Sequence, residues 1–101
     1  MEIQNIQRIK YIEIDTEKAE VKVSYTAKII VKVKNKEVEI EEKLWKNLPL
    51  RYNSDSIIIH LELIEETMNS FENQMNEIIE KIKKTFTDLE QILEKYGYQV
   101  I

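Results

Sequence analysis

The feature that most constrains this chain is a long run of regularly spaced apolar residues in its C-terminal third, which ends at the single glycine, Gly97. Steps of three and four residues place one side chain per turn on one stripe of a helix. We therefore predict one amphipathic helix over residues 64–97, followed by a short tail over residues 98–101. The stripe consists of Ile64, Met68, Phe71, Met75, Ile78, Ile82, Phe86, Leu89, Leu93 and Tyr96.

The spacing of this stripe changes along the helix. From Ile64 to Ile82 it follows a strict heptad, and the extra four-residue step to Phe86 is a stutter. Ile79 and Ile92 widen the stripe only toward the C-terminus. A narrow seam suits a second helix and a broad face suits a sheet, so we expect the N-terminal part to meet a partner helix. The expected oligomer interface consists of Ile64, Met68, Phe71, Met75, Ile78 and Ile82. The alternative is a single core-facing helix without a partner.

Strands are predicted in the N-terminal part, because apolar residues there recur at every second position. The clearest strand covers residues 21–34. A turn at residues 15–18 would join it to an upstream strand over residues 6–15, with Ile14 opposite Val21. These two strands begin an antiparallel meander.

A second hairpin is predicted downstream of the strand over residues 21–34. A two-residue turn at residues 35–36 places Val31 opposite Ile40, and Lys28 opposite Lys43. Apolar residues then share one face and charged residues the other. A slip by one residue would destroy this match, so the pattern fixes which side chains share a face.

Two assignments stay open. Glu42 falls on the apolar face of the third strand, so a bulge there would turn Trp45 inward in place of Leu44. Residues 57–63 fit a fourth strand by alternation and β-branched content, and they also continue the helical stripe backwards. We take them as a fourth strand.

Composition limits the classes of protein that fit. The chain of 101 residues carries a net charge of −4, with +2 on residues 1–54 and −6 on residues 55–101. No cysteine is present, which excludes disulfides and thiolate chemistry. We expect a cytoplasmic protein without a membrane segment, because no apolar run approaches the length of a spanning helix.

Residues that could carry chemistry are few. His60 is the sole histidine and has no cysteine nearby, so a zinc site is not expected. The single glycine at a helix end excludes a glycine-rich phosphate loop. We therefore expect no enzyme activity, no metal and no cofactor.

One face of the predicted sheet combines aromatic and basic side chains. Aromatic rings among lysines can stack bases or bind a small anion, as in several binders of single strands. The competing interpretation is a soluble sheet face or a subunit interface. The residues of this candidate ligand face are Tyr11, Lys22, Lys28, Lys43 and Trp45.

These observations predict an α+β domain, in which residues 1–63 form an antiparallel three- to four-stranded meander and one long helix packs on its apolar face. The helix should be longer than the sheet and leave apolar surface for a second copy, with a homodimer as the first choice. The first functional hypothesis is a small non-catalytic, self-associating module that binds another protein, such as an inhibitor or adaptor of a virus or mobile element. The alternative is a binder of single-stranded nucleic acid or a small anion.

Overall fold

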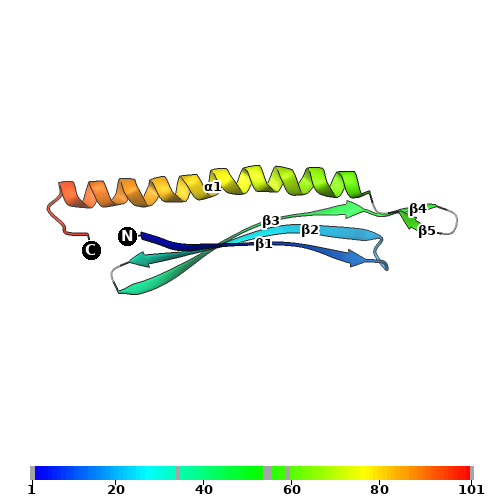
Figure 1. The fold of residues 1–101 in the computed structure, drawn as a ribbon, viewed down its shortest axis with the longest axis horizontal. Coiled ribbons are helices and arrows are strands. Elements are labelled where there is room, and N and C mark those ends of the chain that lie inside the picture. Colours follow the sequence, from blue (N-terminus) through cyan, green and yellow to red (C-terminus); the bar gives the residue numbers. More distant parts are fainter. Residues whose placement is uncertain (1, 34, 54–55, 59, 101) are drawn as a thin grey trace.

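The computed structural model describes residues 2–33, 35–53, 56–58 and 60–100. It has an α+β arrangement, in which three antiparallel strands form one sheet and a single long helix follows them (Figure 1). This confirms the predicted fold class. The elements are β1 (Glu2–Asp15), β2 (Glu20–Val33), β3 (Lys36–Pro49), β4 (Arg51–Asn53), β5 (Ser56–Ile58) and α1 (Leu61–Lys95).

The first hairpin has the predicted register. Ile14 pairs with Val21, and the alternation places apolar residues of both strands on the same face. The Oδ1 atom of Asp15 accepts hydrogen bonds from the backbone N–H groups of Glu17 and Lys18 at 3.1 and 3.0 Å. This Asx arrangement closes the turn.

The second hairpin differs from the prediction by two residues. β2 ends at Val33, which pairs with Lys36, and Val31 pairs with Val38 instead of Ile40. A shift of two leaves every side chain on its predicted face and changes only its neighbours. Lys28 therefore lies opposite Glu41, and the like-charged pair expected in the sequence-based register does not form.

The third strand settles which of two neighbouring side chains faces the helix. The pairing of β2 with β3 runs without interruption past Glu41 and Glu42, so the bulge considered there is absent from this ladder. Leu44 pairs with the buried Tyr25 and shares its face, whereas Trp45 points to the other side.

The prediction of a fourth strand over residues 57–63 is wrong for most of that segment. β5 ends at Ile58 and pairs with β4 in a separate two-stranded sheet. Residues 61–63 belong to α1, which begins three residues before the predicted start, and residue 59 lies outside the described part of the chain. The alternative, a backward extension of the helical stripe, is right for residues 61–63 and wrong for residues 57–58, which lie in β5.

The helix lies lengthwise along one face of the twisted sheet (Figure 1). The helix-facing positions of β2 supply half of the buried apolar residues of the described chain, and α1 supplies four more, between Ile64 and Ile79. The opposite side of the sheet, here called the open face, is not covered by any element of the described chain. The buried apolar residues are Val21, Val23, Tyr25, Ala27, Ile29, Val31, Leu48, Leu50, Ile64, Phe71, Met75 and Ile79.

Gly97 ends the helix as predicted. It has φ = +86°, a conformation that side chains with a Cβ rarely adopt. The N–H of Tyr98 donates to the carbonyl of Leu93 at 3.1 Å, and the N–H of Gly97 donates to that of Glu94 at 3.0 Å. This pair of bonds is a Schellman motif, which satisfies the last carbonyls of the helix.

The molecule is long and thin, with extents of 70 × 21 × 17 Å. Its 14-residue strands reach about 46 Å at roughly 3.3 Å per residue, and its 35-residue helix reaches about 52 Å at roughly 1.5 Å per residue. The C-terminal turns of α1 extend past the start of β1 (Figure 1), and Leu89, Ile92 and Tyr96 are exposed there.

Candidate functional site

The six helix residues predicted as an oligomer interface pack instead against the chain's own sheet. Ile64, Phe71 and Met75 are buried in the core. Met68, Ile78 and Ile82 are partly buried against the same core. Of the two residues that broaden the stripe toward the C-terminus, Ile79 is buried in the core, whereas Ile92 is exposed. The surface assignment therefore needs correction, while self-association itself stays a prediction.

The candidate ligand face is the centre of the open face. Tyr11, Ser24 and Trp45 form one row across β1, β2 and β3. Trp45 is 57% exposed and Tyr11 is 41% exposed, whereas Ser24 between them is fully buried. The predicted row was Ile9, Thr26 and Trp45, so the two-residue shift of β3 brings the two aromatic side chains onto the same row.

Two of the predicted lysines are already engaged with these aromatic rings. The Nζ atom of Lys22 lies 5.2 Å from the ring centre of Trp45. The Nζ atom of Lys43 lies 5.8 Å from the ring centre of Tyr11 and 3.4 Å from its hydroxyl oxygen. Such cation–π contacts stabilise an exposed aromatic side chain modestly. The remaining predicted residue, Lys28, lies on the same face of the sheet, four residues along β2 from Ser24, and it pairs with Glu41.

The environment of Tyr11 favours its ionised form. The Ser24 hydroxyl and the Lys43 ammonium both lower the pKa of the Tyr11 phenol, because each favours the phenolate. Ser24 Oγ is buried and makes no hydrogen bond within the described chain. Lys43 makes the direct contact.

The surface beside Trp45 is mostly acidic. A hollow of about 260 Å³ lies next to its side chain on the open face. Its charged lining consists of Glu13, Asp15, Lys18, Glu20 and Lys22, and Asn47 completes it. Three carboxylates against two ammonium groups disfavour a polyanion at this end of the face.

A polar cluster between β1 and α1 was missed by the sequence analysis. The Nη1 atom of Arg8 donates to the hydroxyl of the buried Tyr25 at 3.0 Å and to Asn76 Oδ1 at 2.7 Å. Arg8 and Lys10 both contact the carboxylate of Glu72, at 3.3 and 2.8 Å. The sequence did contain a signal for this cluster, because the predicted register places Arg8 opposite Ala27 and Lys10 opposite Tyr25, on the apolar face of the sheet.

One edge of the sheet carries exposed apolar side chains. β1 is an outer strand, and in the described chain only β2 pairs with it. Ile12 and Ile14 lie on its helix-facing side and are 46% and 50% exposed, because α1 does not cover this corner. Tyr11 is exposed on the open face of the same strand. We call the backbone of residues 9–14, with these side chains, the β1 edge.

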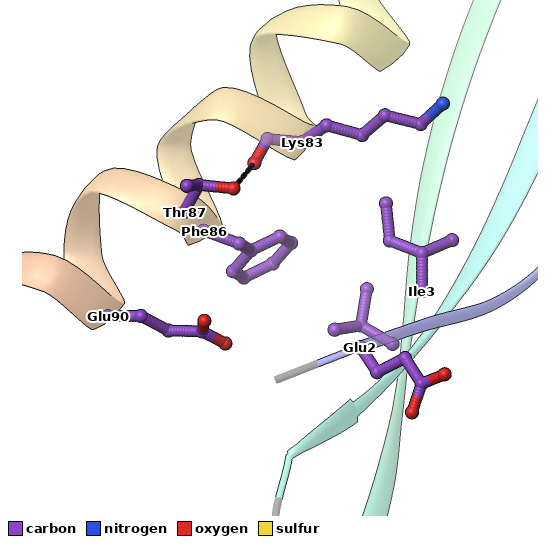
Figure 2. A pocket seen from close by; sticks show the side chains of 7 residues that line it. Glu2, Ile3, Lys83, Phe86, Thr87 and Glu90 are labelled. Atoms are coloured by element: carbon purple, nitrogen blue, oxygen red, sulfur yellow. Dashed lines mark hydrogen bonds between the residues drawn. The ribbon is translucent and has the colours of Figure 1, made fainter. Parts of the chain in front are cut away.

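A second hollow lies where the C-terminal half of α1 meets the beginning of β1 (Figure 2). It measures about 370 Å³, and Ile3, Val31 and Phe86 give it apolar walls. The phenyl ring of Phe86 points toward Ile3 (Figure 2). Its charged lining residues are Glu2, Glu90 and Lys83. The two carboxylates outnumber the one ammonium group, and this excess of negative charge disfavours an anionic ligand.

The remaining features restrict the function only slightly. His60 is exposed and precedes the first residue of α1 without capping it through its side chain. Within the described residues, no group of three acidic or histidine side chains is placed to hold a metal ion. None of the helices described here is long and apolar enough to cross a membrane.

Comparison with protein-family models, curated proteins and solved structures finds no match.

Proposed function

We propose that the protein is a small, non-catalytic interaction module that associates with a second copy of itself. The observation that carries this proposal is the exposure of large apolar side chains on both faces of an outer strand: Ile12 and Ile14 on its helix-facing side, and Tyr11 on the open face. Exposed apolar side chains are unfavourable in water, and association along this strand removes them from solvent. In this proposal, another protein binds to a surface that both copies of the chain form together.

The test of self-association is the mass of the protein in solution. Sedimentation velocity and light scattering over roughly 1–100 μM, the range in which weak to moderate dimers form, should give twice the mass of one chain at the upper end. A single species with the mass of one chain across this range would contradict the proposal. Phe71→Glu does not serve as a test of the interface, because Phe71 is buried in the core and the substitution would unfold the chain.

A second candidate function is binding of single-stranded nucleic acid or a small anion at the centre of the open face. The observation that favours it is the placement of Lys22 and Lys43 beside the rings of Trp45 and Tyr11. Stacking of a base on an exposed aromatic ring contributes about 1–3 kcal/mol. The acidic lining beside Trp45 acts against it, so we rank it second.

Trp45 is the only tryptophan in the chain, so its fluorescence reports directly on this face. Binding of an oligonucleotide should quench the emission, and added salt should weaken binding because counterions are released. Lys22→Glu with Lys43→Glu should abolish the change, whereas Lys81→Glu with Lys84→Glu on the exposed side of α1 should not. Unchanged emission at low salt would contradict this second candidate.

A further inference from the structure

We infer that two copies join through the β1 edge, antiparallel to each other, so that two three-stranded sheets become one continuous sheet. This inference rests on the proposed self-association and names its surface. An outer strand presents a row of unpaired N–H and C=O groups, which readily pair with another strand. The fold leaves two such strands, β1 and β3.

The two outer strands differ in how they discourage pairing. Charged side chains and proline protect an edge strand. β3 carries Pro49 and seven charged residues, and β1 carries five charged residues. The charged residues of β3 are Lys36, Glu37, Glu39, Glu41, Glu42, Lys43 and Lys46. The less protected edge is therefore that of β1.

Two of the five charges on β1 are also directed away from the edge. The ammonium of Lys10 lies 2.8 Å from Glu72 of α1, and the guanidinium of Arg8 contacts Glu72 and Asn76 of the same helix. Both side chains are thereby held over the helix-facing side of the sheet. Between them and Glu13, the edge presents Tyr11 and Ile12.

Symmetry and charge together restrict the register of this pairing. Two antiparallel strands of identical copies are related by a two-fold axis perpendicular to the sheet, so a residue at the axis faces its own copy. We consider axes that pass through residues 9–14. An axis through Ile9 places Arg8 of one copy opposite Lys10 of the other, and an axis through Lys10 places the two Lys10 residues opposite each other. An axis through Glu13 places the two Glu13 residues opposite each other, and an axis through Ile14 places Glu13 opposite Asp15. Only axes at Tyr11 and Ile12 avoid like charges, which are unfavourable when directly opposed.

Both remaining registers cover the exposed isoleucines. An axis at Tyr11 places Ile12 opposite Lys10 and Ile14 opposite Arg8 of the other copy. An axis at Ile12 places Ile12 opposite itself and Ile14 opposite Lys10. The aliphatic stems of Lys10 and Arg8 can lie against isoleucine while their charged ends stay with Glu72. Both helices then lie on the same face of the joined sheet.

The test compares two residues of matched exposure on the two outer strands. Ile12 of β1 and Val38 of β3 are 46% and 47% exposed, and both lie on the helix-facing side. Sedimentation should show that Ile12→Lys shifts the protein to the monomer at concentrations where the wild type and Val38→Lys are dimers. Circular dichroism of all three proteins verifies that the fold is kept.

Disulfide trapping provides an independent measurement, because the natural chain has no cysteine. Under a mild oxidant, Tyr11→Cys or Ile12→Cys should form a covalent dimer at least about tenfold faster than Val38→Cys, since the thiols meet only at the axis. Equal rates for the three variants, or a dimer that survives Ile12→Lys, would overturn the β1 edge while leaving self-association intact. A wild-type monomer would overturn both.

Discussion

The ammonium nitrogen of Lys10 on β1 lies 2.8 Å from the Oε2 atom of Glu72 on α1, and these residues are more than sixty positions apart in the sequence. The other carboxylate oxygen of Glu72 lies 3.3 Å from Arg8, which also donates to Tyr25 and Asn76. The hydrophobic effect is non-directional, so apolar contacts alone define the position of the helix along the sheet only weakly. The hydrogen bonds and ion pairs of this cluster need particular partner atoms, so we expect them to fix the register between helix and sheet.

The same cluster makes stability depend on pH. Lys10, and then the Tyr25 hydroxyl, lower the pKa of Glu72 below the usual glutamate value of about 4.3, because both favour the carboxylate. A lowered pKa in the folded state stabilises the fold above the unfolded pKa, and this contribution is lost as pH falls through the folded pKa. Glu72→Gln should therefore lower the urea midpoint at pH 7, and the difference from wild type should close toward pH 3.

The control for this prediction is Glu77→Gln, because Glu77 is exposed on the same helix. Its urea midpoint should stay close to that of the wild type at both pH values. A difference between Glu72→Gln and wild type that is the same at pH 3 and pH 7 would show that Glu72 acts through packing and not through its charge.

The two ends of the helical stripe should respond differently to truncation. Met75 of α1 is completely buried in the core, so Met75→Ala should lower the unfolding free energy by about 2–5 kcal/mol. Ile92 is exposed beyond the sheet, so Ile92→Ala should change it by less than about 0.5 kcal/mol. Urea denaturation followed by circular dichroism measures both. Comparable losses would mean that the C-terminal turns are covered in solution.

The turn between β1 and β2 offers a stabilising substitution. Ala19 has φ = +52°, a left-handed conformation that costs a residue with a Cβ about 1–2 kcal/mol. Glycine removes this cost and adds about 0.5–1 kcal/mol of unfolded-state entropy, so Ala19→Gly should raise the unfolding free energy by roughly 0.5–1 kcal/mol.

Ala27→Gly serves as the matched control for the turn substitution. Ala27 is buried in the middle of β2, where glycine weakens a strand. Its thermal midpoint should fall while that of Ala19→Gly rises. A fall in both proteins would contradict the strain assigned to Ala19.

The parts of the fold that could be predicted are those set by periodicity. The existence of the first two strands, the end of the helix at Gly97 and the face of each strand residue follow from spacing. The start of the first strand does not, because β1 begins at Glu2, four residues before the predicted start. A period of two cannot distinguish registers that differ by two, because Lys32 finds a glutamate in either one, Glu39 or Glu37. The signal that separates them was the opposition of Lys28 and Lys43, which the observed register replaces with Lys28 and Glu41.

The surfaces were harder to predict, because they depend on where the helix lies across the sheet. The heptad from Ile64 to Ile82 fits a helical partner as well as it fits a sheet, so spacing alone could not identify what covers it. The position of the helix is fixed by contacts between residues distant in sequence, such as Arg8 with Asn76. The exposure of Ile12 and Ile14 is a consequence of that position.

The observed register of the second hairpin makes a prediction of its own. Lys28 and Glu41 are directly opposed on the open face, and opposite charges in such pairs stabilise a sheet by about 0.2–1 kcal/mol. A double-mutant cycle with Lys28→Ala and Glu41→Ala should therefore give a favourable coupling energy of this size by urea denaturation, and 1 M salt should reduce it. The same cycle between Lys28 and Lys43 is the control, because the alternative register opposes these two residues. Repulsion between Lys28 and Lys43 with no coupling between Lys28 and Glu41 would show that β3 is shifted by two residues from the position described here.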